Sequence, residues 1–403
     1  MERLECIRYR IQYFIVVTVR IVFRFFGLFL PVKKNRILFC SFHGMQYTCN
    51  PKYIFESLYR QYGRQFEYVW VIDDATKIPE EFRLVVKTVK FRSLKYICHM
   101  MRADVIIDNS GFEVALPKRK KQLFINTWHG GGAYKKVAAG FNMRSKGLAW
   151  YIRRIQKLTN GTTDCFLSSS KTFTEVTAKD FHIDRSCFVP TGMPRNDRFF
   201  YPSAGRSRNL RQQICGLYDI VPDNLLVLYA PTFRNNGRNM RNIGSDVCCP
   251  CIEHALAMTF GRNITFLYRR HICRNDIATH SRHGTPDVVD LTQYPDMQDL
   301  LDIADVLITD YSSSIWDFAL TGKPGFLYMP DLPEYEYDRG FYTPLDKWPF
   351  PYAESIDELC ELIAAYNAEE NEKRISDHYR LLGSYECGKA IPSVIEIIKG
   401  HTC

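Results

Sequence analysis

One short stretch of the sequence combines an imidazole, a run of glycines and a lysine. It reads LFINTWHGGGAYKK, at residues 123–136. His129 ends an apolar run, and imidazole is the side chain whose unperturbed pKa lies near neutrality, so it can accept a proton. Backbone N–H groups without side chains beside them can form a concave anion site. The stretch therefore predicts a base next to an anionic ligand. The residues expected to hold that ligand are Gly130, Gly131, Gly132 and Lys135.

Cationic side chains end a second apolar run, FLYRRHI, at residues 266–272. Guanidinium and imidazole groups at the end of a strand can stabilise negative charge on a phosphate. We therefore predict a phosphate-binding role for Arg269 and His271. A solvated basic edge of the sheet is the alternative.

Serines follow a third apolar run in VLITDYSSSIWDFAL, at residues 306–320. Asp310 ends the predicted strand, and Ser314 with Asp317 fits a capping box, in which each side chain bonds a backbone N–H of the first helical turn. A helix N-terminus attracts phosphate. Two further hydroxyls are then predicted to face a ligand there: Ser312 and Ser313.

Two proline turns carry polar residues of the same form. LYAPTFR, at residues 228–234, presents Thr232 and Arg234 after a strand. TGMPRNDRFF, at residues 191–200, repeats the form in the first half of the chain. Its polar residues are candidates for the acceptor or phosphate side of a site: Arg195, Asn196 and Asp197.

Several familiar motifs are missing from the sequence. It has no Walker loop, G-x-G-x-x-G, G-x-S-x-G or H-E-x-x-H, which argues against a P-loop NTPase, a simple nicotinamide enzyme, a serine hydrolase and a zincin. The 14 cysteines are scattered, which favours reduced thiols in a cytoplasmic protein. A denser group (Cys248, Cys249, Cys251 and His254) lacks Cys-x2-Cys spacing, so we expect packing at a helix start rather than a metal site.

The elements that must position these residues alternate along the chain. Near-continuous apolar strands separated by helices indicate parallel sheets covered on both faces. Helices are expected at 51–62 and 93–103. Strands are expected at 36–42, 68–73, 84–91, 104–109, 123–128, 165–170 and 187–192, and again at 225–233, 264–271, 288–292, 306–312 and 325–329.

The pattern loosens into polar and basic residues at 201–223, where we expect the domain junction. The predicted fold is α/β, with two doubly wound, Rossmann-like domains at 34–205 and 206–403 that face a central ligand cleft. The C-terminal helix could pack back on the first domain.

The N-terminal segment, residues 1–33, predicts an amphipathic helix that lies on a membrane. Arg20 and Arg24 interrupt its apolar run, which then falls short of the roughly 20 residues of a span. A basic helix of this kind binds an anionic leaflet, and the net charge of +9 also favours an anionic partner. The basic side holds Arg3, Arg10, Arg20 and Arg24, and the apolar side holds Ile15, Val19, Val22 and Phe26. The alternative is a helix packed on its own domain.

Taken together, the motifs resemble the CDP-glycerol glycerophosphotransferase family of teichoic acid and capsule synthesis. The matching stretches are NTWHG, GMPRND, YAPTFR, RRH, TDYSS with DF, and RGFY at 339–342, in that order. The segment GMQYTCNPKYIFESL, at 44–58, also looks like the family. One departure is Gly131-Gly132, where the family commonly has Thr-Pro.

The resemblance implies a GT-B fold on the cytoplasmic face of a bacterial membrane, attached peripherally. It implies transfer of an alditol phosphate from CDP-glycerol, or a relative such as CDP-ribitol, to a lipid-linked glycan or polymer, with release of CMP and without a cofactor or metal. His129 matches the proposed general base and His271 the second functional histidine near the donor pyrophosphate. The donor-phosphate contacts match Arg234, Ser312 and Ser313, and less directly Asp317.

Two other functions remain open on the sequence. A GT-B glycosyltransferase with a UDP-sugar donor would share the fold and the basic phosphate site, and would release UDP. A membrane-associated binding protein without catalysis is the other alternative. No recognised nucleic-acid module occurs, so nucleic acid is not an expected partner. The oligomeric state is open.

Overall fold

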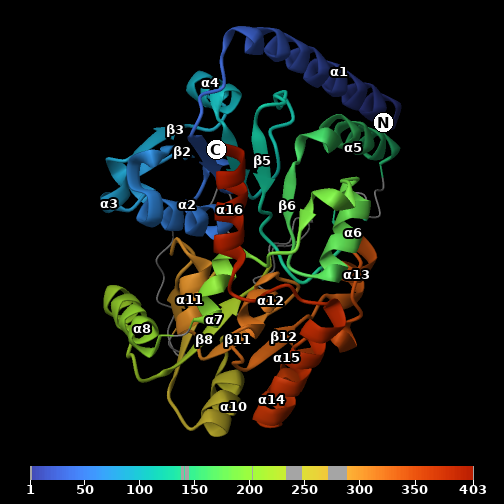
Figure 1. Ribbon diagram of the computed structural model, residues 1–403. Coiled ribbons are helices and arrows are strands. Elements are labelled where there is room, and N and C mark those ends of the chain that lie inside the picture. The colour runs from blue at the N-terminus through green and yellow to red at the C-terminus, as the bar shows by residue number, and fades with distance from the viewer. Residues whose placement is uncertain are drawn as a thin grey trace. The chain divides into compact units, whose positions relative to one another are not determined.

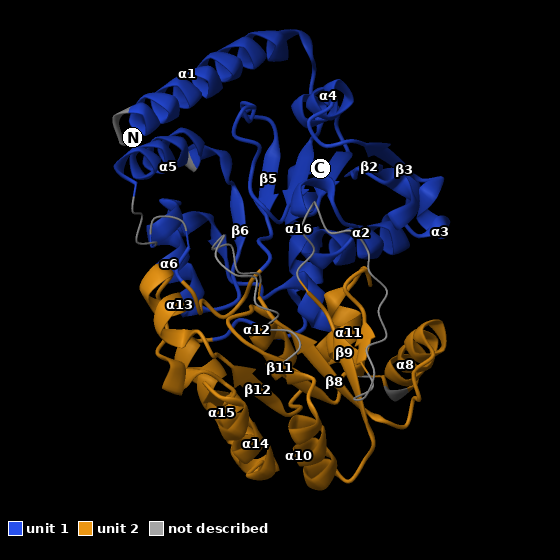
Figure 2. Ribbon diagram, turned by 180° about the vertical axis from the view of Figure 1, so that it is seen from behind, with its two compact units in different colours: residues 1–129, 136–197, 384–403 blue, residues 130–135, 198–383 orange. Residues whose placement is uncertain are grey.

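The computed structural model describes residues 2–137, 140, 145–201, 203–232, 247–270 and 288–402. The chain forms two compact units, coloured separately in Figure 2. Unit 1 comprises residues 1–129, 136–197 and 384–403, and unit 2 comprises residues 130–135 and 198–383. The chain therefore leaves unit 1 directly after His129, contributes a short glycine-rich segment to unit 2, and returns. Its main crossing lies between Asp197 and Arg198.

A parallel sheet forms the centre of unit 1 (Figure 1). Among the described residues its order is β3-β2-β1-β4-β5-β6-β7, and every pairing is parallel. All the strands expected in the first half of the chain are confirmed: β1 (Arg36–Cys40), β2 (Glu67–Val71), β3 (Val86–Val89), β4 (Val105–Asp108), β5 (Leu123–Asn126), β6 (Cys165–Leu167) and β7 (Phe188–Val189).

Helices cover both faces of this sheet, which is why its central strands are apolar throughout. In β1, Ile37 and Phe39 join one apolar cluster, whereas Leu38 and Cys40 join another on the opposite face. The described helices of unit 1 are α1 (Glu2–Phe26), α2 (Cys49–Tyr62), α3 (Glu80–Arg83), α4 (Leu94–Arg102), α5 (Lys146–Thr159), α6 (Lys171–Phe181) and α16 (Ala390–Thr402), and the short helix α7 (Asp197–Phe200) lies where the chain crosses into unit 2. The helices expected at 51–62 and 93–103 correspond to α2 and α4.

Unit 2 is built around a second parallel sheet, of order β10-β9-β8-β11-β12-β13. Its strands are β8 (Leu225–Ala230), β9 (Ile264–Tyr268), β10 (Val288–Asp290), β11 (Val306–Thr309), β12 (Gly325–Tyr328) and β13 (Tyr352–Ala353). All but β13 were expected. Its described helices are α8 (Ala204–Tyr218), α10 (Pro250–Phe260), α11 (Met297–Ile303), α12 (Ser314–Ala319), α13 (Leu332–Asp338), α14 (Ile356–Ala364) and α15 (Ala368–Leu382).

The stretch 201–223, expected as a loosened junction, instead contains the helix α8. Ser203 caps it by accepting a hydrogen bond from the backbone N–H of Arg206. Ile214 and Cys215 are buried, and Leu210 and Tyr218 are partly buried against the same apolar cluster. So few apolar positions among polar residues give only a weak periodic signal in the sequence.

Both sheets reverse their strand order beside the first strand, between β1 and β4 in unit 1 and between β8 and β11 in unit 2. Open α/β sheets bind ligands outside the carboxyl ends of the strands at such a reversal. The predicted site residues follow β5 in unit 1 and follow β8, β9 and β11 in unit 2. The fold thus gives each unit its own candidate ligand edge.

The N-terminal helix α1 packs on unit 1 along one face and leaves large apolar side chains exposed on the rest. Tyr13 contacts Trp150 of α5 with ring centroids 5.5 Å apart, and Phe23 packs against the apolar cluster beneath the sheet. Ile15, Val22 and Phe26, three residues of the predicted apolar side, are exposed. By length and composition alone, the stretch Leu4–Phe29 could cross a membrane, so the expectation that its arginines make it too short is not supported.

Arg20 departs from the predicted basic face. Its guanidinium Nη1 donates to the backbone carbonyls of Val114 and Leu116, at 2.7 and 2.8 Å, so it points into unit 1 instead of toward solvent. The loop after β4 presents these carbonyls to α1, and a guanidinium can satisfy both at once.

Candidate functional site

His129 lies where β5 ends and the chain turns sharply. The Asn126 side chain accepts a hydrogen bond from the backbone N–H of Trp128, at 2.9 Å, and Trp128 has a φ of 49°. The ring of His129 is then held by the loop after β4, because its Nδ1 lies 2.7 Å from the carbonyl oxygen of Asn109. A carbonyl can only accept, so Nδ1 carries the proton and Nε2 carries the lone pair of the neutral ring. This is the tautomer that a general base needs.

A buried amide and a buried guanidinium fix the backbone at the same turn. Asn50, at the start of α2, donates from Nδ2 to the carbonyls of Thr127 and Trp128, at 3.0 and 3.1 Å. Its Oδ1 accepts from the backbone N–H of Arg195, at 3.1 Å. Arg195 in turn donates from Nη1 to the carbonyl oxygen of His129, at 2.9 Å. The ring and the backbone carbonyl of His129 are therefore both held by hydrogen bonds to other parts of unit 1.

The predicted acceptor-side residues after the proline turn are buried and have partners within unit 1. Asn196 Nδ2 donates to Glu386 at 3.1 Å. Asp197 accepts from the backbone N–H groups of Ala390 and Ile391, at 3.0 and 2.7 Å, and so caps α16. Burial raises the pKa of this carboxyl. These residues thus hold parts of unit 1 together, and their contact with an acceptor stays an untested prediction.

Close packing accounts for the glycines that follow His129. A Cβ on Gly131 would lie 2.3 Å from the Trp316 ring, and Gly132 has a φ of +77°, which disfavours any other residue. All three glycines are buried. Lys135 forms an isolated antiparallel β-bridge with Phe341, which joins the glycine-rich segment to the rest of unit 2. An anion-binding role for its N–H groups remains a prediction.

Three predicted donor-site residues follow adjacent strands of unit 2. Asp310, after β11, accepts two bonds from the backbone N–H of Thr232, at 3.0 and 2.9 Å, and a further bond from its hydroxyl. Thr232 follows β8, so this contact spans the reversal of strand order. Arg269 follows β9, the other neighbour of β8. The structure therefore brings these residues to one edge of the sheet.

Arg269 is a partly buried cation that the described carboxylates near it offset only in part. Within the described residues, its Nη1 is buried without a hydrogen-bond partner. Burial lowers the pKa of Arg269 to about 10, and the nearby carboxylates of Asp296 and Asp299 offset this only in part. Asp299 already accepts bonds from Arg198 and Tyr294, at 2.7 and 3.1 Å. An anionic ligand would supply the missing partner.

The capping box predicted for the serine loop is wrong. Ser313 already has right-handed helical dihedrals, φ −67° and ψ −11°, so Ser314 is the first helical residue and not an extended cap. The hydroxyl of Ser312 accepts from the N–H and the hydroxyl of Ser314, at 3.2 and 2.8 Å. Asp317 accepts from Gln298 Nε2 at 2.9 Å. The Ser312 oxygen thus supports the turn, and the contact of Ser312 with a donor stays a prediction.

Two predicted residues, Arg234 and His271, lie outside the described residues. The cysteine group lies at the start of α10, where Cys249 Sγ is 2.9 Å from Cys251 Sγ. Among the described residues, no three histidine, cysteine or acidic side chains gather as a metal site.

Sequence reasoning did not single out Asn50, Asn109 or Glu386. Asn50 had a usable signal, since a polar residue directly before a proline at a helix start favours a cap or a buried contact. Asn109 acts through its backbone carbonyl, which no side-chain pattern reveals. Glu386 joins distant parts of the chain and had no local signal.

Beside this site, Asp108 makes stability depend on pH. It ends β4 and is buried, and burial raises the pKa of its carboxyl to about 7. The unfolded chain loses this proton near pH ~4. Between about pH 4 and 7 the folded state therefore binds more protons than the unfolded state, and stability falls as the pH rises.

We expect the substitution Asp108→Asn to remove this contribution. The free energy of unfolding of the unsubstituted chain should fall across that range by on the order of 2 kcal/mol more than that of the variant. Urea unfolding of both proteins at several pH values measures the difference. Parallel pH profiles would contradict the assignment to Asp108.

Comparison with known proteins places the chain in a family. Residues 22–400 match the family described as CDP-Glycerol:Poly(glycerophosphate) glycerophosphotransferase. A teichoic acid poly(glycerol phosphate) polymerase of Bacillus spizizenii is 29% identical over 393 residues, which cover 94% of this chain and 95% of the relative. A teichoic acid glycerol-phosphate transferase of Staphylococcus aureus is 28% identical over 380 residues, with 91% and 93% covered.

Solved structures agree on the fold. A structure of the wall teichoic acid polymerase TagF has a TM-score of 0.77 and 25% identity, and the match covers 92% of this chain and 90% of that chain. This likeness and the two parallel sheets confirm the expected GT-B-like α/β fold. The chain belongs to the CDP-glycerol:poly(glycerophosphate) glycerophosphotransferase family.

Proposed function

We propose that this enzyme transfers an alditol phosphate from a CDP-linked donor to a hydroxyl of a glycan or polymer acceptor and releases CMP. The family supports the reaction class. The relatives' names support teichoic acid synthesis, and they include both glycerol-phosphate and ribitol-phosphate enzymes. The observation that carries the proposal is the His129 ring, held through Nδ1 by Asn109 at 2.7 Å.

In this reaction His129 acts as the general base. The acceptor oxygen attacks the β-phosphorus of the donor while its proton moves to Nε2 of His129. The bond between that phosphorus and the oxygen of CMP breaks, and CMP leaves with the negative charge. A positioned base of this kind contributes a factor of about 10²–10⁴ in rate.

Cationic side chains stabilise the charge on the leaving CMP. Among the described residues, Arg269 is the candidate for stabilising this charge, because it is partly buried and its Nη1 lacks a partner within those residues. Asp310 supports it indirectly by holding the turn at Thr232 on the neighbouring strand. Charge-stabilising groups fixed before the reaction need no reorganisation during it. The proposal assigns this role to side chains and requires no cofactor.

The proposal places the protein on the cytoplasmic face of a bacterial membrane, through α1. The exposed apolar side chains of this helix and the cations around it support membrane attachment. A lipid-linked acceptor would be available at the same surface.

A donor screen tests the reaction. The purified protein is incubated with membranes of its host and, separately, with CDP-glycerol, CDP-ribitol or UDP-sugars, and the released nucleotide is measured. We expect release of CMP that requires both a CDP-alditol and the membranes. Release of UDP alone would establish the glycosyltransferase instead, and no release from any donor would favour a non-catalytic binding protein.

A further inference from the structure

A cavity of about 600 Å³ lies in unit 1 along the C-terminal half of α1. Part of its wall is apolar and comes from α1 and from Leu158 of α5. No carboxylate is among its described lining residues. Its cationic lining comes from α1 and from the loop before β5: Arg20, Arg24, Lys118, Arg119 and Lys120.

Among the residues that the structure describes, most of this charge has no acidic partner. Arg20 and Arg119 donate to backbone carbonyls, which satisfy their N–H groups but carry no charge. Burial lowers the pKa of Arg20, so its charged form is disfavoured where it lies. Only Lys118 has a carboxylate partner among the described residues, Asp164 at 2.5 Å. A cavity with excess positive charge is stabilised by an anion.

The apolar surroundings define what kind of anion fits. Ile21 and Leu28 line the cavity and are 63% and 75% exposed, and Phe25 and Phe29 beside them are also exposed. Large exposed apolar side chains next to clustered cations are typical of helices that lie at the headgroup level of a membrane. A phosphate that carries hydrocarbon chains matches both the charge and the apolar side chains.

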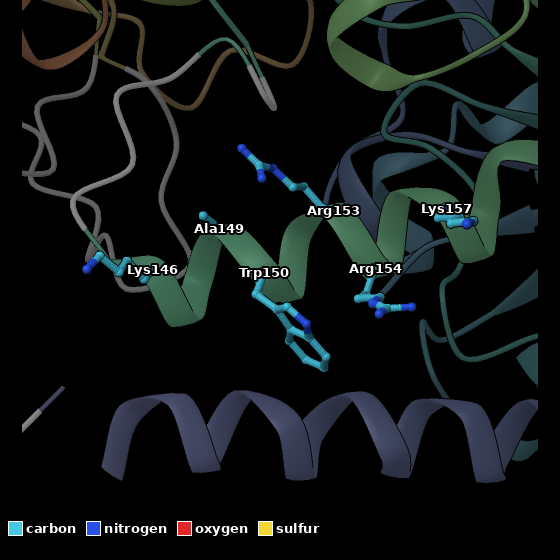
Figure 3. Close-up of a pocket in the computed structure, with 6 residues that line it drawn as sticks. All are labelled: Lys146, Ala149, Trp150, Arg153, Arg154 and Lys157. Carbon is cyan, nitrogen blue, oxygen red and sulfur yellow. The ribbon is translucent and has the colours of Figure 1, made fainter. Parts of the chain in front are cut away.

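The basic surface continues along α5. A neighbouring pocket of about 500 Å³ is lined by Arg153, Arg154 and other residues of this helix, and its described lining also includes no carboxylate. Figure 3 shows Trp150 pointing toward α1 and Arg153 pointing away from it. Arg154 lies over the Trp150 ring, 5.7 Å from its centroid. Trp150 thus packs α5 against α1, and α5 carries a further group of cations in its own pocket.

We propose that the cavity formed by Arg20, Arg24 and Lys120 binds the phosphate group of a membrane lipid. This inference rests on the proposed function only because both place α1 on a membrane. It adds a discrete binding site to what would otherwise be general attraction between a basic helix and an anionic leaflet.

Vesicle flotation with the full chain tests the site. Arg24 and Lys120 make no hydrogen bond or ion pair with another described residue, so the double variant Arg24→Gln/Lys120→Gln removes charge from the cavity and should leave the fold intact. The control Arg64→Gln/Lys179→Gln removes the same charge from exposed positions of unit 1. A third variant, Arg24→Lys/Lys120→Arg, keeps the charge. Vesicles contain phosphatidylcholine alone or with phosphatidylglycerol.

We expect the unsubstituted chain to bind vesicles that contain phosphatidylglycerol, and the cavity variant to bind them roughly 30-fold more weakly. The surface control and the charge-conserving variant should stay within about twofold of the unsubstituted chain. Equal losses in the cavity variant and the surface control would overturn the site in favour of general electrostatics. Binding abolished by excess inorganic phosphate, with equal affinity for both vesicle types, would identify a site for soluble phosphate instead.

Flotation needs no turnover, so its result is independent of the proposed reaction. CMP release from an acceptor dissolved in detergent should be the same for the cavity variant and the unsubstituted chain. Loss of CMP release in both proteins would count against the proposed function and leave the lipid site standing.

Discussion

Replacing His129 with alanine should reduce the rate of CMP release by about 10³-fold and leave the affinity for the donor within about twofold. The ring is held through Nδ1, so the substitution removes the lone pair on Nε2 that would take the acceptor's proton. The proposed donor contacts follow β8, β9 and β11 of unit 2, on a different sheet. Single-turnover release of CMP and calorimetric binding of the donor measure the two effects separately.

The matched control is His254→Ala, because His254 is an exposed histidine on α10. It should change neither quantity. The variant His129→Gln keeps much of the side-chain volume and should be as inactive as the alanine variant while unfolding at a similar temperature. Turnover by His129→Ala at the rate of the unsubstituted chain would remove His129 from the role of base.

The strands were predictable from the sequence because burial on both faces leaves a strong local signal. Runs such as Leu225–Ala230 are apolar at every position, since alternate side chains enter two different cores. The placement of His129, Arg269 and Asp310 at strand ends follows from the same signal. Helix α8 was missed as a helix because only a few of its residues are buried, and β13 is too short to carry a pattern.

The partners of the polar residues were not predictable, because they lie far away in the sequence. Arg195 bonds the carbonyl of His129, 66 positions away, and its expected contact with a ligand stays a prediction. The absence of a side chain on Gly131 makes room for Trp316, and its expected contact with an anion stays a prediction. In each case the motif was recognised from the sequence. The tertiary contact that explains its residue types left no pattern in the neighbouring sequence.

The serine loop illustrates a different limit. A capping box depends on one residue being extended, and the sequence Ser312-Ser313-Ser314 offers three equivalent caps. Gln298, on α11, donates to the Asp317 carboxylate at 2.9 Å. A tertiary hydrogen bond of this kind competes with the local caps that the sequence offers.

Replacing Arg269 with methionine should stabilise the folded chain and weaken catalysis together. Methionine removes a partly buried charge whose Nη1 has no described partner, so the free energy of unfolding should rise by about 1–3 kcal/mol. The same substitution removes a cation proposed to hold the donor phosphates, so kcat/KM for the donor should fall by about 10²–10³. Urea unfolding and initial rates of CMP release measure the two changes.

A rise in the free energy of unfolding together with a fall in kcat/KM distinguishes a ligand-binding role of Arg269 from a structural one. If Arg269 mainly stabilised unit 2 through Asp296 and Asp299, methionine would lower the free energy of unfolding and leave the kinetics nearly unchanged. The control Arg208→Met makes the same chemical change at an exposed position of α8 and should alter neither property. The donor should also raise the unfolding temperature of the unsubstituted chain more than that of Arg269→Met, because a ligand that binds the folded state more tightly stabilises it more at the same concentration. A donor-binding residue that costs stability in the empty protein accounts for all three results.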